Sequence, residues 1–307
     1  MMRCQGQRQG SNIGLWVTLW LAVLVLSPTV VSATSLLPLV TQQAQTLPDG
    51  VAEATIGLAY SGDGRFPGFI ESGALRRQTV LQAPQLGFNI GVGNWAEFQA
   101  SYETVYLDEQ AANGQTNTQF GGGDARIFTK LHFVGETQHI PGMGIWFGTK
   151  LPDATRSSLL GTDDADFGAD FVLSKDFGMF AAHANLGIFL LGNSGPVIGN
   201  GFTAGGQDDL FNYNLALVSQ PLGASEAGAT ALRLMAEFTG ASGSRFGNDR
   251  DAMRFGLQMN RGRGTVYLGV SAGLITASEN IGASTGFIYT FEPSTLLAWL
   301  KEGPSTP

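Results

Sequence analysis

The sequence predicts an all-β fold, a closed antiparallel up-and-down transmembrane β-barrel of about 12 strands. Three observations predict it: apolar residues recur at every second position between residues 50 and 291, charged residues are scarce, and long connections alternate with short ones. Of the 307 residues, 43% are hydrophobic, only 14% are charged and 43 are Gly, a composition that suits one large β-domain.

The first 33 residues are typical of a secretory signal peptide. Arg3 and Arg8 precede an apolar stretch from residue 15 to residue 26, and Val31-Ser32-Ala33 offers the small residues that a signal peptidase accepts. The alternative is a retained anchor, but the stretch is shorter than the roughly 20 residues that a spanning helix needs. We therefore exclude residues 1–33 from the fold and expect residues 34–49 to form a periplasmic N-terminal stretch.

Cysteine usage and charge exclude several classes of function. Cys4, the only cysteine, lies in the predicted signal peptide, so disulfide scaffolds, cysteine metal sites and thiol catalysis are excluded together. Cleavage after Ala33 removes two of the 17 basic residues and none of the 25 acidic ones, which leaves a formal charge of −10. Nucleic acid is not an expected partner, because phosphate binding needs a basic face.

Alternation with a period of two residues marks the strands. Between residues 264 and 275, Val266, Leu268 and Val270 share one face, while Thr265 and Ser271 share the other. This pattern is typical of a membrane barrel, apolar toward lipid and polar toward the lumen. The alternative is a soluble periplasmic β-protein whose apolar faces pack on one another. The predicted strands span residues 50–60, 82–92, 95–107, 122–134, 143–152, 164–174, 178–191, 209–219, 230–241, 251–261, 264–275 and 281–291.

Connection lengths orient the predicted barrel, which spans residues 50–291. The connections 61–81 and 108–121 are long, whereas 93–94 and 262–263 are two residues each. Bacterial barrels carry long outer loops and tight periplasmic turns, so we expect the barrel to begin in the periplasm. We then expect residues 292–307 to be a periplasmic C-terminal tail, with a short helix as a candidate structure. Aromatic residues near the strand ends are candidates for interfacial girdles: Tyr60, Tyr106, Phe211, Tyr213, Tyr289 and Phe291.

Charged residues in the other phase of the strands are expected to face the lumen. Such side chains select solutes by charge when they line a pore, and the alternative is a salt-bridged network that fills a narrow barrel and conducts nothing. The candidate lumen-lining residues are Glu97, Glu103, Asp124, Arg126, Lys130, His132, Lys150, Asp164, Asp166, Asp170, Arg233, Glu237 and Arg254.

Cross-strand ion pairs are the expected arrangement of these side chains. Glu97 and Glu103 are expected near Arg126 and Lys130. The carboxylates at 164, 166 and 170 are about 7 Å apart per two residues of strand, too far for one calcium cage, so we expect them to pair with Lys150 or Arg126. No metal and no cofactor are expected.

Enzyme chemistry is not expected. The only histidines are His132, His139 and His183, and an outer-membrane lipase would have to pair one of them with a serine and an orienting amide or acid. No Gly-x-Ser-x-Gly motif is present. His183 lies beside Asn185 on one face, an arrangement more often found in a packed pair.

Short motifs between residues 120 and 190 resemble a known family. They are Gly123-Asp124-Ala125-Arg126 with Lys130, Gly148-Thr149-Lys150-Leu151-Pro152, Leu160-Gly161-Thr162-Asp163, and Asn185-Leu186-Gly187. This series resembles the outer-membrane transporters grouped as the "MetA-pathway of phenol degradation" family. The resemblance implies a barrel in the outer membrane and uptake of aromatic or other hydrophobic compounds, and it implies no catalytic residues.

The function expected from the sequence is an outer-membrane channel or transporter for passive uptake of small solutes, with aromatic or hydrophobic compounds as candidates. The alternative is a non-conducting structural or binding barrel, whose lumen is blocked by packed charges, loops or the stretch from Thr34 to Pro48. The expected partners are outer-membrane lipid and lipopolysaccharide, the barrel-assembly machinery and a small-molecule solute.

Overall fold

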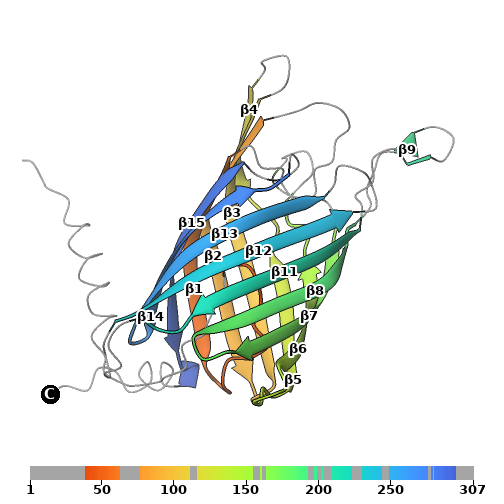
Figure 1. Ribbon diagram of the computed structural model, residues 1–307. Helices are drawn as coiled ribbons and strands as arrows, with labels where there is room; N and C mark the ends of the chain where they lie inside the picture. The colour runs from red at the N-terminus through yellow and green to blue at the C-terminus, as the bar shows by residue number, and fades with distance from the viewer. Residues whose placement is uncertain are drawn as a thin grey trace, which may run out of the picture.

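The computed structural model describes residues 39–62, 77–110, 116–154, 160, 164–192, 197–198, 202–203, 209–222, 230–243, 249–275, 278 and 280–294. It is a closed antiparallel barrel of tilted strands (Figure 1). Its strands are β1 (Ala52–Gly62), β2 (Arg77–Val92), β3 (Ala96–Gln110), β4 (Thr116–Gly122), β5 (Arg126–Val134), β6 (Gly142–Lys150), β7 (Asp166–Asp176), β8 (Phe180–Leu190), β11 (Leu210–Ser219), β12 (Ala231–Gly243), β13 (Arg250–Arg261), β14 (Gly264–Gly273) and β15 (Ile281–Phe291). The short strands β9 (Val197–Ile198) and β10 (Phe202–Thr203) pair with each other.

The ring closes at β1 and β2. β1 pairs with the last barrel strand from Ala52 opposite Phe291 to Gly62 opposite Ile281, and β2 pairs with both β1 and β3. β4 and β5 share one position beside β3, so the ring has twelve strand positions. Closure removes the unpaired edges that lipid would penalise. The predicted all-β, up-and-down barrel of about 12 strands is confirmed.

The predicted strand 122–134 is divided in the structure. Gly123-Asp124-Ala125 leaves the ladder between β4 and β5. There the Gly123 N–H donates to the Glu103 carbonyl oxygen at 2.8 Å, and the Ala125 carbonyl oxygen accepts from the Leu151 N–H at 2.8 Å. β2 also begins at Arg77, five residues before the predicted start at 82, because it extends with β3 beyond the barrel wall.

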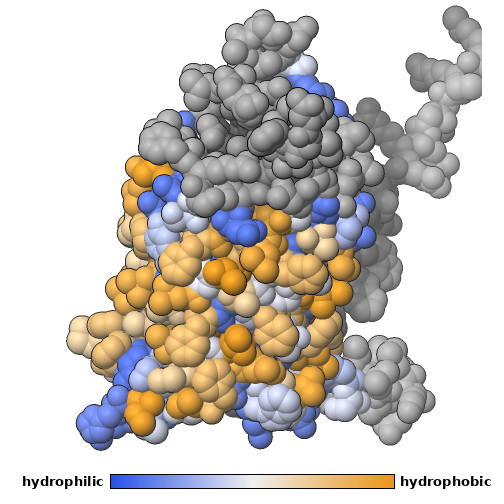
Figure 2. Space-filling model, turned by 90° about the vertical axis from the view of Figure 1, so that its right-hand side faces the viewer, coloured by the Kyte–Doolittle hydropathy of each residue, from blue (hydrophilic) through white to orange (hydrophobic). Residues whose placement is uncertain are grey.

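The apolar phase of the strands faces outward. On β14, Val266, Leu268 and Val270 are exposed, while the alternate residues Thr265 and Ser271 are buried. Figure 2 shows apolar side chains gathered around the middle of the barrel, with hydrophilic ones near its lower end. In the described strands the apolar faces therefore do not pack on one another, as a soluble β-protein would require.

The two ends of the barrel differ. The short turns after β2, β7 and β13 lie at one end, called here the short-turn end, and the other end is called the long-loop end (Figure 1). Gly93 and Gly262 have φ values of 59° and 58° in the turns after β2 and β13, a conformation that glycine adopts without steric cost. Within the described residues, no helix is long and apolar enough to cross a membrane. The predicted signal peptide and the tail after residue 294 lie outside the described residues.

Candidate functional site

The charged residues predicted for the lumen lie on the inner face of the wall or at its long-loop rim. Most of them are buried although they are charged: Glu97, Glu103, Asp124, Lys130, Asp166, Asp170, Arg233 and Glu237. Arg126, Lys150 and Arg254 line an internal cavity. His132 and Asp164 are half-buried, and the His132 Nε2 lies 2.7 Å from the Val134 carbonyl oxygen, near the short-turn end.

Two ion pairs join β3 to β5. The Arg126 Nη2 lies 3.0 Å from the Glu103 Oε1, and the Lys130 Nζ lies 3.2 Å from the Glu97 Oε2. Register explains the second pair, because Glu97 stands directly opposite Lys130 in the ladder. The predicted pairing of these four residues is confirmed. A buried charge needs such a partner, since an isolated one would have to be desolvated without compensation.

Lys150 extends this network across three chain segments. Its Nζ lies 3.1 Å from the Asp124 Oδ2 and 2.8 Å from the Asp166 Oδ2. Asp170 instead accepts the Asn212 amide N–H with both carboxylate oxygens, at 2.8 and 2.9 Å. The carboxylates of β7 therefore divide between a lysine and an amide, and the described residues contain no cluster of His, Cys, Asp or Glu suited to a metal ion.

A serine and a histidine meet on β7 and β8. The Ser174 Oγ lies 2.8 Å from the His183 Nδ1, and it also accepts the Ala44 backbone N–H at 2.8 Å. Ser174 and His183 are each 2% exposed. Because Ala44 covers the hydroxyl, the described structure offers no approach for a substrate to this serine. Asn185, the neighbour considered for a catalytic role, hydrogen bonds to Gln42 instead.

Residues 39–49, called here the N-terminal segment, lie inside the barrel, as in the alternative of a lumen blocked by the stretch from Thr34 to Pro48. Its backbone N–H groups donate to inward-facing side chains of four strands. The acceptors, in chain order, are Glu237 for Leu39, Val40 and Thr41, Asn185 for Gln42, Ser174 for Ala44 and Glu97 for Leu47. The segment expected as a periplasmic stretch thus enters the lumen. The segment carries little charge and has no periodic pattern, so its sequence did not distinguish the lumen from the periplasm.

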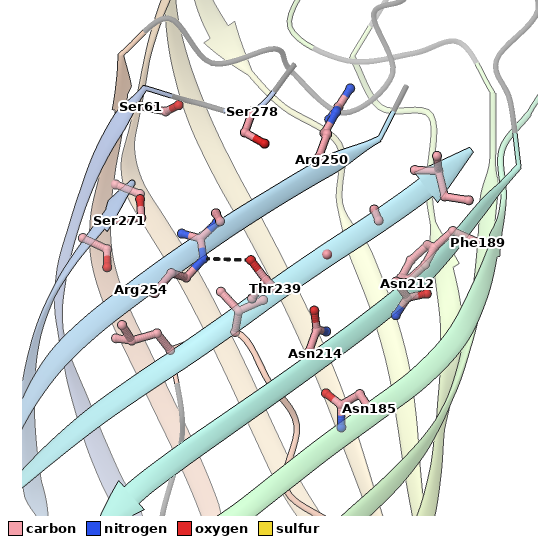
Figure 3. A pocket seen from close by; sticks show the side chains of 18 of the residues that line it. Ser61, Asn185, Phe189, Asn212, Asn214, Thr239, Arg250, Arg254, Ser271 and Ser278 are labelled. Atoms are coloured by element: carbon pink, nitrogen blue, oxygen red, sulfur yellow. Dashed lines mark hydrogen bonds between the residues drawn. The ribbon is translucent and has the colours of Figure 1, made fainter. Parts of the chain in front are cut away.

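The lumen contains a cavity of about 620 Å³ above this segment. Leu39, Val40 and Gln42 line it toward the short-turn end, and residues near the long-loop end, including Arg250 and Ser278, line it on the other side. Figure 3 shows Arg250 and Arg254 on β13 and the amide side chains of Asn185, Asn212 and Asn214 on β8 and β11, all of which line this cavity. The Arg254 Nε lies 3.4 Å from the Thr239 Oγ1. We call this space the vestibule.

Aromatic side chains form one wall of the vestibule. Phe128 and Trp146 stack with their ring centroids 4.0 Å apart and an interplanar angle of 5°, and Phe189 lies 6.2 Å from Trp146. Glycines behind the rings make room for them: a Cβ on Gly148 would lie 2.6 Å from the Phe128 Cδ1, and one on Gly168 would lie 2.5 Å from the Phe189 Cε1. The rings therefore lie close against the wall. Trp146 itself lines the lumen.

Comparison with known proteins supports the architecture. No protein-family model matches the sequence, and no curated protein matches it. Among solved structures, an outer-membrane channel from Pseudomonas putida F1 matches with a TM-score of 0.57 at 13% identity, over 81% of this chain and 98% of its own. The translocator domain of the autotransporter NalP from Neisseria meningitidis matches with a TM-score of 0.47 at 14% identity, over 78% and 88% of the two chains.

A third match is the CymD monoaromatic hydrocarbon channel, with a TM-score of 0.41 at 12% identity, over 80% of this chain and 89% of its own. The last two scores are too low to carry an argument. Membership of the MetA-pathway family stays a prediction, because no family model supports it. At 13% identity the likeness establishes the fold, so this chain is similar in fold to an outer-membrane channel.

Proposed function

We propose that the protein is an outer-membrane channel through which small solutes diffuse. The observation that carries the proposal is the vestibule: a cavity of about 620 Å³ inside a closed ring, lined by charged and amide side chains. A polar interior and an apolar exterior belong together in a barrel that lies in lipid and admits water-soluble molecules. A soluble barrel of this size would instead expose its apolar band to water.

The solute class that the vestibule suits is small and aromatic. The faces of Phe128 and Trp146 and the edge of Phe189 offer stacking partners for a planar ring. Across the lumen, Arg250 and Arg254 offer donors to polar substituents (Figure 3). A solute with one planar ring is therefore expected to spend longer in the vestibule than an aliphatic solute of the same size.

Single-channel conductance tests the proposal. Protein purified from outer membranes is added to a planar bilayer, beside an Arg126→Ala variant. This variant leaves Glu103 without its ion-pair partner, so the reversal potential in a salt gradient should shift toward cation selectivity. Arg261→Ala, at the short-turn end, removes the same charge away from the vestibule and serves as the control.

The second candidate function is a non-conducting barrel that binds a solute or serves the membrane structurally. The N-terminal segment favours it, because the segment crosses the lumen and is bound there by several side chains. Correct insertion is seen as a heat-modifiable band on gels. If the protein and both of its variants insert correctly but show no conductance steps, the result would contradict the channel and favour this candidate.

A further inference from the structure

The lumen wall contains a binding site for an extended peptide backbone, and residues 39–47 occupy it. We propose that these residues are a displaceable plug: seated, they close the vestibule toward the short-turn end, and withdrawn, they open the channel. This inference rests on the proposed channel function. It goes beyond that function by naming the element that controls passage and the side chains that hold it.

The seat recognises the backbone of the plug. The Asn185 Oδ1 accepts the Gln42 N–H at 2.7 Å, and the Asn185 Nδ2 donates to the Gln42 carbonyl oxygen at 2.8 Å. The Glu97 Oε2 accepts the Leu47 N–H at 2.8 Å, and the Glu237 carboxylate accepts the N–H groups of three consecutive residues. A carboxylate that accepts backbone N–H groups makes charge-assisted bonds, which are stronger than neutral ones.

The shape of the wall also matches the plug. A Cβ on Gly256 or Gly269 would lie 2.9 or 2.7 Å from the Leu39 Cδ1, so the leucine side chain occupies space that these glycines leave. At the other end of the plug, a Cβ on Gly91 would lie closer than contact distance to the backbone of Leu47. Thr41, Ala44 and Leu47 are between 0% and 5% exposed, which shows that the contact excludes solvent.

The hydrogen bonds that hold the plug can break without disrupting the barrel wall. Residues 39–48 carry no charged side chain. In the described part of the chain, the plug is held by side chains, and the first backbone-to-backbone bond to the wall is from the Gly50 N–H to the Gly91 carbonyl oxygen, at 3.1 Å. Withdrawal therefore breaks no strand ladder, and residues 48–50 form the point at which the plug joins the wall.

The seat keeps partners of its own when the plug leaves. Glu97 retains Lys130 and the Gln99 amide, whose Nε2 lies 2.6 Å from the Glu97 Oε1. Arg254 stays directly opposite Glu237 in the ladder. Neither carboxylate is left without compensation, but both lose backbone donors and meet lumen water. The open channel should therefore prefer cations more than the closed one does.

A disulfide tether tests the proposal, because the chain without its predicted signal peptide has no cysteine. Gln42→Cys with Asn185→Cys links the plug to its seat. The matched control, Ala181→Cys with Val218→Cys, joins two opposed buried residues of β8 and β11 and leaves the plug free. After oxidation, we expect the tethered variant to show only small conductance steps. After reduction, we expect steps several-fold larger and a reversal potential shifted toward cations, with no such change in the control.

A second measurement needs no conductance. A single cysteine at Ala44→Cys is fully buried in the seated plug, so a water-soluble maleimide should label it in the folded barrel only when the plug leaves. Failure to label before the barrel unfolds would overturn the proposal, as would equal conductance of the tethered variant in both redox states. Labelling without conductance in any variant would retain the displaceable plug and contradict the channel function on which passage depends.

Discussion

Asn185 and Gln42 hydrogen bond to each other twice, once as acceptor and once as donor, although 143 residues separate them. The side chain of one strand residue thereby satisfies both backbone groups of a residue outside the wall. This pairing fixes the N-terminal segment at the level where the vestibule begins, and it makes Asn185 the most direct point at which to disturb the segment.

Asn185→Ala should loosen the N-terminal segment without unfolding the barrel. The substitution removes the partners of the Gln42 backbone N–H and carbonyl oxygen, and an unsatisfied buried group costs about 1–3 kcal/mol. We expect the Gln42 amide to exchange its hydrogen faster in mass spectrometry, while strand amides keep their protection. Asn214→Ala is the control, because Asn214 stands opposite Asn185 on β11 and lines the same cavity. Equal exchange in the two variants would contradict the role of Asn185.

The ion pair between Lys130 and Glu97 should be strongly coupled. Lys130 is fully buried, so Lys130→Met alone leaves a buried carboxylate without its cation and should lower the free energy of unfolding by about 3–5 kcal/mol. Glu97→Gln added to it should restore much of that loss, since no buried charge remains. Urea unfolding of the unchanged protein, of Lys130→Met, of Glu97→Gln and of the double variant gives the coupling energy. Additive effects of the two changes would refute the prediction.

Trp146→Ala should reduce the selectivity for aromatic solutes. The change removes the ring that stacks on Phe128, and stacked pairs contribute about 0.5–1.5 kcal/mol beyond their buried area. In liposome-swelling assays, we expect the uptake rate of a phenyl-bearing solute to approach that of an aliphatic one of equal size. Phe147→Ala removes the adjacent aromatic ring, which faces outward, and should leave the ratio unchanged.

Gly148→Ala should strain the aromatic wall. The added Cβ would lie 2.2 Å from the Ile127 carbonyl oxygen and 2.6 Å from Phe128, so the wall must shift, and overpacking of this kind costs about 1–3 kcal/mol. Gly135→Ala is the matched control, because nothing lies within 4 Å of its Cβ position. Thermal unfolding monitored by the loss of the folded gel band compares the two, and equal midpoints would show that the wall yields freely.

Leu268→Arg should test where the membrane lies. Leu268 is exposed on the outer face of β14, and an arginine at the bilayer midplane costs about 2–4 kcal/mol. Leu274→Arg, just beyond the end of β14 near the long-loop end, should cost about 0–1 kcal/mol because it lies near the interface. Folding equilibria into lipid vesicles measure both, and a larger cost at 274 than at 268 would place the bilayer elsewhere on the barrel.

Much of the fold was determined by local pattern. A strand in a closed barrel alternates between two environments, so a period of two residues assigns each side chain to the lumen or to the outside. The assignment also predicted that Glu97 and Glu103 lie near Arg126 and Lys130, and the register then paired Lys130 with Glu97. The alternation does not assign Trp146 to the lumen or to the outside, because Ile145 and Phe147 beside it are apolar too. Its position opposite Lys130 in the ladder shows that it faces the lumen.

The sequence by itself determined the closed β-barrel, the two faces of its strands and the nearness of Glu97 and Glu103 to Arg126 and Lys130, because these depend on spacing along the chain. Only the tertiary structure decided that residues 39–49 enter the lumen, that Gly123-Asp124-Ala125 interrupts a strand and that three aromatic rings share one wall. Thr41 and Glu237 are 196 residues apart, and their contact follows from closure of the ring. Closure of the ring brings the inward faces of all strands to one lumen. The periodicity of a single segment does not show which residues meet in that lumen.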